Sequence, residues 1–396
     1  MAAVPDRLSK LSERASDTAA SLHTVKPLRI GIMLRHWEQH GGVTVYARQL
    51  IKAMLQLGSP HTFVLFYRDR NACGAFADIS NVHEVVLPAR TILLWDQLAV
   101  RRAIDDYRID VLFNPKYSIP LRAPCPTAWV CHGLDWYVMP QASPLRHRLA
   151  HRFLVPRYAK EASAVISVSK ITSEHLAQYL DLSGERVHTV YPGVSPLFAR
   201  HFAPDELDAI RAHWHLPRRY VVYSGALYPP KNFRRLVQAY ARVGPRLGVS
   251  LVIAGGENRY LSEDEVHEPE RLGLGPWVRR LGWVDHESLP GIYAMADALM
   301  LPSTFESVGL PVLEAMSAGC PVLTSNRCGT KELAGGAALL VDPDSVDSIA
   351  AGLEHLLTDA DERSRLIAAG RVRAARFTWD ATARNVLDVL ERIAKT

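Results

Sequence analysis

Short apolar runs alternate with longer helical patterns along nearly the whole chain, and this alternation constrains the fold more than any other feature. The runs are rich in Val, Ile, Leu, Phe and Ala, and they occupy residues 28–33, 62–66, 111–113, 128–131, 164–168, 187–190, 219–224, 250–254, 298–301 and 321–324. Apolar strands separated by helices are typical of parallel sheets that helices cover on both faces. The sequence therefore predicts an α/β protein.

The alternation falls into two series. A stretch rich in Pro, His and charge, from about 192 to 217, separates them. At about 100–200 residues per domain, a chain of 396 residues makes two domains. We expect two doubly wound, Rossmann-like domains. The predicted boundaries are a disordered tail at 1–26, an N-terminal domain at 27–200, a C-terminal domain at 201–378 and a last helix at 379–396.

Composition excludes several other classes of protein. The sequence has no run of about 18 apolar residues, so no transmembrane helix is expected, and its first 26 residues lack the apolar segment of a signal peptide. The five cysteines are scattered without CxxC spacing, which predicts neither a zinc site nor a disulfide framework. The net charge of +5 suits anionic ligands, and no nucleic-acid-binding motif occurs. We expect a cytoplasmic protein without nucleic-acid partners.

The segment TFESVGLPVLEAMSAGCPVLTSN, residues 304–326, sets two carboxylates around a predicted helix start. Glu306 falls in the loop after an apolar strand, Pro311 suits the first helical turn, and Glu314 falls one turn further on. Ligands of open α/β sheets bind at this end of the strands. The backbone amides that a helix start leaves free for an anion belong to Ser307, Val308, Gly309 and Leu310.

The amides can bind a phosphate, and the two carboxylates can accept hydrogen bonds from hydroxyl groups. A nucleotide sugar carries both phosphates and hydroxyl groups, so it suits this segment. The alternative is that Glu306 and Glu314 only stabilise the helix start through its dipole. Lys231 supports the first interpretation, because it follows another strand end and a loop with Gly225, where a cation can neutralise a departing diphosphate. A solvated surface lysine is the alternative there.

Two N-terminal segments also bring polar or flexible residues to strand ends. Gly41 and Gly42 follow the first strand and open a helix, where paired glycines let the backbone approach a ligand closely; a tight turn is the alternative. His132 ends the strand at 128–131, and Asp135 follows in the next turn. A histidine at a strand's carboxyl end faces the ligand crevice, although a lone histidine is more often structural.

Two motifs favour other chemistries less well. Asp342-Pro-Asp344 follows an apparent strand and resembles a metal-binding DxD, but aspartates beside a proline are common in turns. Gly273-Leu-Gly275 begins like a dinucleotide fingerprint, yet it lacks the third glycine and a preceding strand, which argues against an NAD-dependent oxidoreductase. We therefore expect no metal and no nicotinamide cofactor.

Residues 306–314, ESVGLPVLE, resemble the E-x7-E motif of the retaining family 4 glycosyltransferases, which have the GT-B fold. Four further segments resemble that family: VHTVYPGVS at 187–195, VYSGALYPPKN at 222–232, VRRLGWV at 278–284 and YAMAD at 293–297. The resemblance covers roughly residues 28–394. It implies two Rossmann-like domains facing a cleft, with an N-terminal acceptor domain, a C-terminal donor domain and a last helix that crosses back to the N-terminal domain.

The resemblance also implies roles for single residues. Glu306 would contact the hydroxyls of the donor sugar, Glu314 the ribose, and His132 the donor sugar at the reaction centre, with Asp135 beside it. The amides of Val308, Gly309 and Leu310 would hold the sugar and diphosphate, and the loop at Gly41 and Gly42 would close on the phosphate. The segment implied for contact with the base is Gly282, Trp283 and Val284.

The implied reaction moves a hexose from a nucleotide diphosphate sugar to a hydroxyl of a glycan or lipid-linked acceptor, with retention, an α linkage and no metal. The loop YPPKN and the turn CHGLD look like those of bacterial polysaccharide mannosyltransferases, which favours GDP-mannose. One departure is that Pro230 and Ala226 stand where the family often has an arginine; Arg234 or Arg235 is the candidate to compensate. That departure keeps open a non-catalytic carbohydrate-binding or scaffold protein. A nucleotide-sugar epimerase or hydrolase is the remaining alternative.

The segment PLRHRLAHRFLVPRYAK, residues 144–160, is basic and partly amphipathic. It suits peripheral contact with an anionic membrane on the inner face of the plasma membrane, which would bring the enzyme to a lipid-linked acceptor. The alternative is a solvated face beside the acceptor cleft. Pro156 is expected to interrupt any single long helix here.

Overall fold

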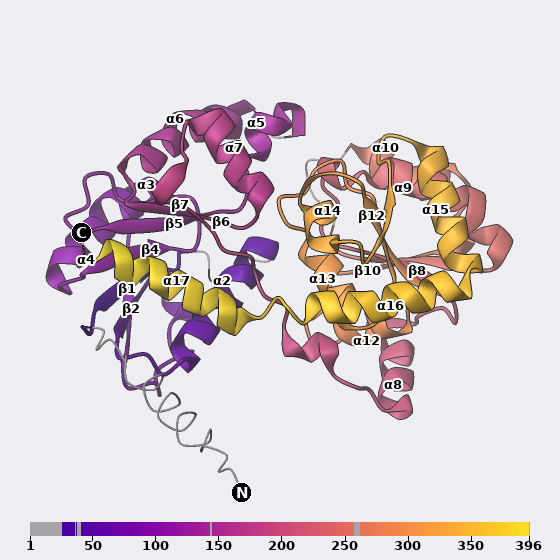
Figure 1. Cartoon of the computed structure of the whole chain (residues 1–396), viewed down its shortest axis with the longest axis horizontal. Helices are drawn as coiled ribbons and strands as arrows, with labels where there is room; N and C mark the ends of the chain where they lie inside the picture. Colours follow the sequence, from indigo (N-terminus) through magenta and orange to yellow (C-terminus); the bar gives the residue numbers. More distant parts are fainter. Residues whose placement is uncertain (1–25, 36, 38–40, 143–144, 257–261, 396) are drawn as a thin grey trace, which may run out of the picture.

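The computed structural model describes residues 26–395 apart from 36, 38–40, 143–144 and 257–261, so the tail predicted at 1–26 lies almost wholly outside the described residues. The described chain forms two α/β halves that lie side by side, each built on its own sheet (Figure 1). All strand pairs of the two sheets, as described, are parallel. The predicted fold class, two Rossmann-like domains, is confirmed.

The N-terminal sheet has seven strands in the spatial order β3-β2-β1-β4-β5-β6-β7. They are β1 (Arg29–Met33), β2 (Thr62–Tyr67), β3 (Val82–Val86), β4 (Val111–Asn114), β5 (Thr127–Cys131), β6 (Ala164–Ser167) and β7 (Val187–Thr189). The chain builds outward from β1 to β3 and then returns to the other side of β1 with β4. This reversal opens a crevice beyond the carboxyl ends of β1 and β4, which is where such sheets bind ligands.

The C-terminal sheet repeats this plan with six strands in the order β10-β9-β8-β11-β12-β13. They are β8 (Tyr220–Ser224), β9 (Ser250–Ala254), β10 (Val278–Gly282), β11 (Ala298–Leu301), β12 (Val322–Ser325) and β13 (Leu339–Val341). Here the order reverses between β8 and β11. The second ligand crevice is therefore expected beyond the ends of these two strands.

Helices cover both faces of each sheet. The longer ones in the N-terminal half are α2 (Gly42–Gln56), α4 (Val100–Asp106), α6 (Leu145–Glu161) and α7 (Lys170–Leu180). Those in the C-terminal half are α8 (Pro204–Trp214), α9 (Phe233–Val243), α12 (Leu289–Met295), α13 (Leu310–Ser317), α14 (Cys328–Ala334), α15 (Val346–Thr358) and α16 (Ala360–Ala374). Within the part of the chain that the structure describes, no helix is both long enough and apolar enough to cross a membrane.

Burial explains why the apolar runs become central strands. All residues of β5, β8, β11 and β12 are buried, and one cluster of apolar side chains fills the whole C-terminal half. A strand covered on both faces gains free energy from every apolar side chain, at about 25 cal/mol per Å² of apolar surface removed from water. Such strands therefore show a continuous apolar run and not an alternation of apolar and polar residues.

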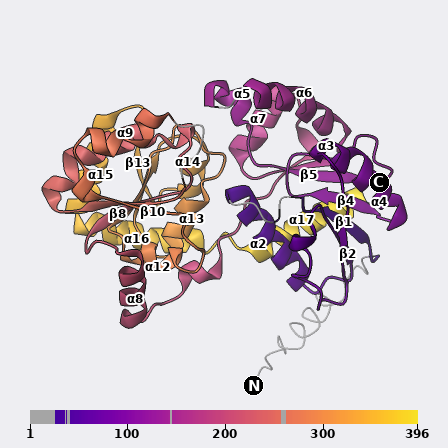
Figure 2. The same ribbon diagram turned by 180° about the vertical axis from the view of Figure 1, so that it is seen from behind.

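The last helix, α17 (Trp379–Ile393), returns to the N-terminal half and packs on its core, as predicted. Two chain segments cross between the halves side by side, and they are joined by a bridge between Val194 and Thr378. A Cβ atom at Gly193 would lie 2.2 Å from the backbone nitrogen of Trp379, so only glycine fits this crossing. Both crossings are visible in Figure 2, which views the molecule from behind.

The structure corrects three local predictions. The edge strands β3 and β10 were not among the predicted runs, because both carry exposed polar residues (for example His83 and Arg279). The interruption expected at Pro156 is wrong, since α6 continues through it from Leu145 to Glu161. Proline removes one backbone hydrogen bond and strains the preceding turn. Packing of Val155 and Tyr158 in the core offsets that cost.

Candidate active site

The loop between β11 and α13 carries most of the predicted site residues. Gly309 is the N-cap of α13 with a φ of 87°, and a Cβ there would lie 2.7 Å from Thr330 Cγ2. Glycine is thus required for both conformation and space. No side chain caps the helix, so the amides around Ser307, Val308 and Leu310 stay available to a ligand at its positive end. The helix start therefore lies where the sequence predicted it, and its role in binding an anion stays a prediction.

Lys231 and Glu306 meet at this loop from opposite sides of the β8–β11 reversal. Their side chains form an ion pair and are 16% and 13% exposed, and Ser303 Oγ donates to the same carboxylate at 3.2 Å. Gly225 lies directly beneath the lysine, because a Cβ at this position would be 3.8 Å from its Nζ. Lys231, which is expected to bind the diphosphate, is therefore paired with Glu306, which is expected to bind the sugar.

Glu314 lies on α13 beside the same lysine. Burial raises the pKa of its carboxyl to about 7, against the opposing effects of the Tyr293 hydroxyl, 3.4 Å away, and of the Lys231 charge. A carboxylate that titrates near neutrality suits a group that accepts hydrogen bonds from hydroxyls once a ligand arrives. The structure thus brings Lys231, Glu306 and Glu314 together with the free amides of α13.

The segment predicted for the base lies further along the sheet. Gly282 ends the edge strand β10 with a φ of 69°, after a register shift in its pairing with β9. Trp283 is 53% exposed, whereas Val284 is buried in the core. An exposed aromatic ring beside a left-handed glycine can offer both a stacking face and backbone groups.

The N-terminal half contributes the turn after β5. Burial lowers the pKa of His132 to about 4, so the imidazole is neutral at physiological pH. Its Nε2–H donates to the Pro115 carbonyl at 2.7 Å, which leaves Nδ1 as an acceptor. Tyr46 packs edge-on against the ring at 4.7 Å. A neutral, oriented histidine can bind a hydroxyl group and does not act as a cation.

Gly133 and Asp135 carry this turn against the other half of the molecule. A Cβ at Gly133, whose φ is 133°, would lie 1.9 Å from Ser307 Oγ. Asp135 accepts a hydrogen bond from the Tyr228 hydroxyl at 2.9 Å. The turn at 132–135 (the histidine turn) therefore abuts the loop between β11 and α13 (the predicted donor loop), and the predicted residues of the two halves converge there.

The other predicted glycines, Gly41 and Gly42, open α2. Gly41 is the N-cap with a φ of 123°, and its carbonyl accepts from the amides of Thr44 and Val45 at 3.1 and 3.0 Å. A Cβ at either glycine would meet nothing within 4 Å. The start of this helix is therefore open at both glycines, which suits approach by a ligand.

Three contacts that join the halves were not predicted from the sequence. Ser169, the N-cap of α7, donates a hydrogen bond from Oγ to the Ser307 carbonyl at 2.6 Å. The start of α7 thus anchors the loop between β11 and α13. Glu332 accepts hydrogen bonds from the amides of Lys170 and Ile171 at 2.8 and 3.2 Å. This carboxylate of the C-terminal half therefore lies at the positive end of α7, a helix of the N-terminal half. Ser169 was recognisable as a helix N-cap, but no signal in the sequence links it to a loop so distant along the chain.

The candidate replacements for the family's arginine are engaged elsewhere. Arg234 pairs with Glu268 at 3.7 Å, and Arg235 donates to Asn232 Oδ1 at 3.1 Å. Neither contact brings a second cation to Lys231. The predicted phosphate site thus has one lysine and the helix amides.

The DxD motif also has a structural role. Arg327 pairs with Asp342 at 2.7 Å and with Asp344 at 2.8 Å, which ties the loop after β13 to the start of α14. Among the described residues, no group of three or more His, Cys, Asp or Glu side chains is arranged to hold a metal ion. These aspartates therefore stabilise a loop through ion pairs.

Comparison with known proteins follows the division of the chain into two halves. Residues 40–196 match the family model described as Glycosyltransferase Family 4, and residues 208–373 match the model described as Glycosyl transferases group 1. The chain is 29% identical to O-antigen chain mannosyltransferase B of Escherichia coli over 283 residues, which are 70% of this chain and 73% of the relative.

A second relative is the serotype-specific mannosyltransferase WbdA of Escherichia coli. It is 24% identical over 298 residues, which are 74% of this chain but only 36% of the relative. Among solved structures, Anabaena Alr3699/HepE in complex with UDP and glucose aligns with a TM-score of 0.75 and 18% identity, over 92% of this chain and 100% of that one. At this identity, the structural likeness concerns the fold.

Proposed function

Because the chain belongs to the family 4 glycosyltransferases of GT-B fold, we propose that it transfers a hexose from a nucleotide diphosphate sugar to a hydroxyl of a glycan or lipid-linked acceptor, with retention and an α linkage. The observation that carries the proposal is the convergence of Lys231, Glu306 and Glu314 on the uncapped start of α13. The site offers one cation, a row of amides and two hydroxyl acceptors, which are the groups that a nucleotide sugar requires.

The proposed reaction depends on stabilising the leaving diphosphate. Lys231 and the amides of Val308 and Leu310 would carry the charge that develops as the sugar leaves, which is the largest contribution such a site can make. His132 is neutral and lies across the contact between the halves, so it would bind a sugar hydroxyl through Nδ1. Glu306 would orient the sugar, and Glu314 would bind the ribose.

The donor is proposed to be GDP-mannose. The support is the naming of two relatives as mannosyltransferases, together with the resemblance of the YPPKN loop and the CHGLD turn. A UDP-linked sugar is the competing donor, since HepE was crystallised with UDP and glucose.

Thermal denaturation with UDP-, GDP-, ADP- and TDP-sugars tests the donor site. A ligand at 100 times its dissociation constant stabilises the folded state by about 2.7 kcal/mol. We expect one nucleotide series to stabilise the wild type, and we expect Lys231→Ala and Glu314→Ala to reduce the shift strongly. The exposed Lys331→Ala serves as control. If no nucleotide sugar stabilises the wild type, the non-catalytic alternative replaces the transferase. NMR analysis of the anomeric configuration of the product tests retention.

We further propose that the N-terminal half rests on an anionic membrane, as the basic segment at 144–160 suggested. On α6, Leu145, Leu149 and Phe153 are spaced four residues apart and are 58%, 57% and 60% exposed. Exposed apolar residues at this spacing share one helix face, and the same helix carries several arginines.

A second apolar group lies next to this face. Ile92, Leu93 and Leu94 of α3 (Ile92–Leu94) and Leu98 of the π-helical turn η2 (Trp95–Ala99) are exposed. Both views of the molecule have α3 close to α6 (Figures 1 and 2). Apolar side chains at one face beside a basic helix complement a bilayer whose surface is negatively charged.

Vesicle flotation tests this surface. Vesicles containing phosphatidylglycerol should carry the wild type, whereas neutral phosphatidylcholine vesicles should carry much less. Leu149→Asp together with Phe153→Asp should prevent flotation. Val372→Asp is the matched control, because Val372 is an equally exposed apolar residue, at 63%, on the other half. Retained binding by the double variant would refute the proposal.

A further inference from the structure

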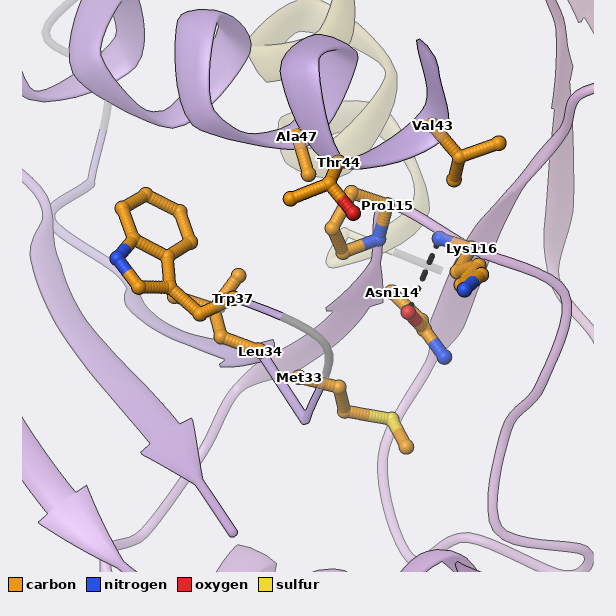
Figure 3. A pocket seen from close by; sticks show the side chains of 9 residues that line it. All are labelled: Met33, Leu34, Trp37, Val43, Thr44, Ala47, Asn114, Pro115 and Lys116. Carbon is orange, nitrogen blue, oxygen red and sulfur yellow. Dashed lines mark hydrogen bonds between the residues drawn. The ribbon is translucent and has the colours of Figure 1, made fainter. Parts of the chain in front are cut away.

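A cavity lies at the reversal of the N-terminal sheet, beyond the carboxyl ends of β1 and β4 and beneath the start of α2 (Figure 3). Its enclosed volume is about 20 Å³, and the whole hollow, with the space open to solvent, is about 310 Å³. The residues around it are Met33, Leu34, Trp37, Val43, Thr44, Ala47, Asn114, Pro115 and Lys116. It therefore occupies the place in this half that the donor site occupies in the other, the point where strand order reverses.

The lining is apolar apart from a few groups at one end. Figure 3 shows Trp37 at one side and Lys116 at the other. Asn114 is already used: its Nδ2 donates to the Ser118 carbonyl at 2.6 Å, and its Oδ1 accepts from the Lys116 amide at 3.0 Å. These bonds fix the turn that follows β4, so the lysine is held on a defined backbone.

Within the described part of the chain, the charge of Lys116 has no counter-ion. Among the described residues, no Asp or Glu oxygen lies within 4.0 Å of its Nζ. The nearby Arg35 is itself paired with Asp96. Burial, and then repulsion by Arg35, lowers the pKa of Lys116 to about 8, so the group is still mostly charged at neutral pH. An unpaired cation in a partly buried cavity is unfavourable unless an anion completes it.

The cavity is joined to the reaction centre by its own backbone. Pro115, which lines it, accepts the hydrogen bond from His132 Nε2 at 2.7 Å. The charge of Lys116 also contributes to lowering the pKa of His132, so the two side chains are near enough to interact through their charges. A molecule in the cavity would hold one end beside Lys116 and present another to the histidine.

We propose that Lys116 binds an anionic group, a phosphate or a carboxylate, on the acceptor that receives the sugar, and that it selects charged over neutral acceptors. This inference rests on the proposed transferase function. The apolar wall formed by Met33, Leu34 and Trp37 would pack against the uncharged part of the same acceptor. Lys116 is thus a specificity-determining residue, and His132 faces the reacting end.

Calorimetric titration of the full chain tests the proposal with three probes: mannose 6-phosphate, glucuronate and the neutral methyl α-mannoside. The wild type should bind at least one charged sugar about tenfold or more tightly than the neutral one, as expected for a charge pair that is partly desolvated. Phosphate and carboxylate probes then distinguish the two kinds of anion. Lys116→Met should remove the preference, and Lys160→Met, an exposed lysine of the same half, should retain it.

Two further measurements keep the outcomes distinct. Lys116→Met should not lower the melting temperature, because it removes an unpaired charge and leaves an apolar chain of similar length. Its affinity for GDP and UDP should equal that of the wild type; a loss would assign Lys116 to the donor and overturn the proposal. Equal or absent binding of charged and neutral sugars to the wild type would also overturn it. Failure of every form to bind a nucleotide would instead refute the proposed function.

Discussion

The ion pair between Lys231 and Glu306 makes a prediction that is opposite for its two members. Both residues belong to the proposed donor site, so a simple view expects either substitution to weaken binding of a nucleoside diphosphate. The structure favours a different result. Lys231 must leave or share Glu306 before it can pair with a phosphate, so Glu306 competes with the ligand for the cation of the loop.

The magnitude follows from burial and distance. Two unit charges about 4 Å apart attract each other by about 4 kcal/mol at an effective dielectric constant of about 20, and exposed pairs contribute about 0.2–1 kcal/mol net. The side chains here are 16% and 13% exposed, which lies between these limits. We expect Lys231→Met to weaken binding of GDP or UDP by about 2 kcal/mol, or about thirtyfold. Glu306→Gln should strengthen it by about 1 kcal/mol, or about fivefold.

Isothermal titration with nucleoside diphosphates provides the assay, because these ligands lack the sugar that Glu306 is proposed to orient. The gain in Glu306→Gln should disappear in the double variant with Lys231→Met, since no cation is then left to release. Lys331→Met, an exposed lysine of the same half, is the control for general loss of positive charge. If Glu306→Gln leaves nucleotide affinity unchanged or lowers it, the competition argument is wrong. Transfer activity of this variant should fall despite the tighter binding.

Three further predictions concern other parts of the structure. The pKa of Glu314 is raised from 4.5 to about 7, so the folded state holds an extra proton between these values. The free energy of unfolding should therefore fall by about 3 kcal/mol as pH rises through that window, and Glu314→Gln should flatten this dependence in urea titrations. Gly133→Ala should keep the fold but hold the halves apart, because its Cβ would lie 1.9 Å from Ser307 Oγ. Transfer should drop by about tenfold or more, because the reacting groups of the two halves are then misplaced, and small-angle scattering should report a larger radius. Gly74→Ala, with a φ of 107° and open space around it, should change neither. Leu390→Ala, in the fully buried face of the last helix, should cost about 2–5 kcal/mol in chemical denaturation; a cost below about 1 kcal/mol would mean that the helix is not part of the N-terminal core.

The central strands could be predicted from the sequence because burial on both faces leaves a continuous apolar signature. The run at 298–301 coincides with β11, and the run at 250–254 coincides with β9. The edge strand β3 lacks this signature, since part of it meets solvent, and it was missed for that reason. Pro156 failed as a helix breaker because tertiary packing outweighs a local propensity when the flanking residues are buried.

The parts of the site that are local in sequence were predictable in the same way. A strand end, a left-handed glycine and an early proline locate the start of α13, and these features lie within one short segment. The pairing of Lys231 with Glu306 was not predictable, because 75 residues separate them and either side chain could have faced solvent. The resemblance assigned both residues to the donor, yet it carried no information about their contact without a ligand.

The two halves of the molecule repeat one topology, and this repetition supports the proposed place of the reaction. Each sheet reverses its strand order once, between β1 and β4 and between β8 and β11, and each reversal carries a lysine beside a helix start. Lys231 has a carboxylate partner from its own half, whereas Lys116 has none among the described residues. The donor loop and the histidine turn touch where Gly133 meets Ser307. In the proposed reaction, a sugar at the C-terminal reversal reaches an acceptor at the N-terminal one across this contact, so a side chain at Gly133 should reduce transfer without preventing either ligand from binding.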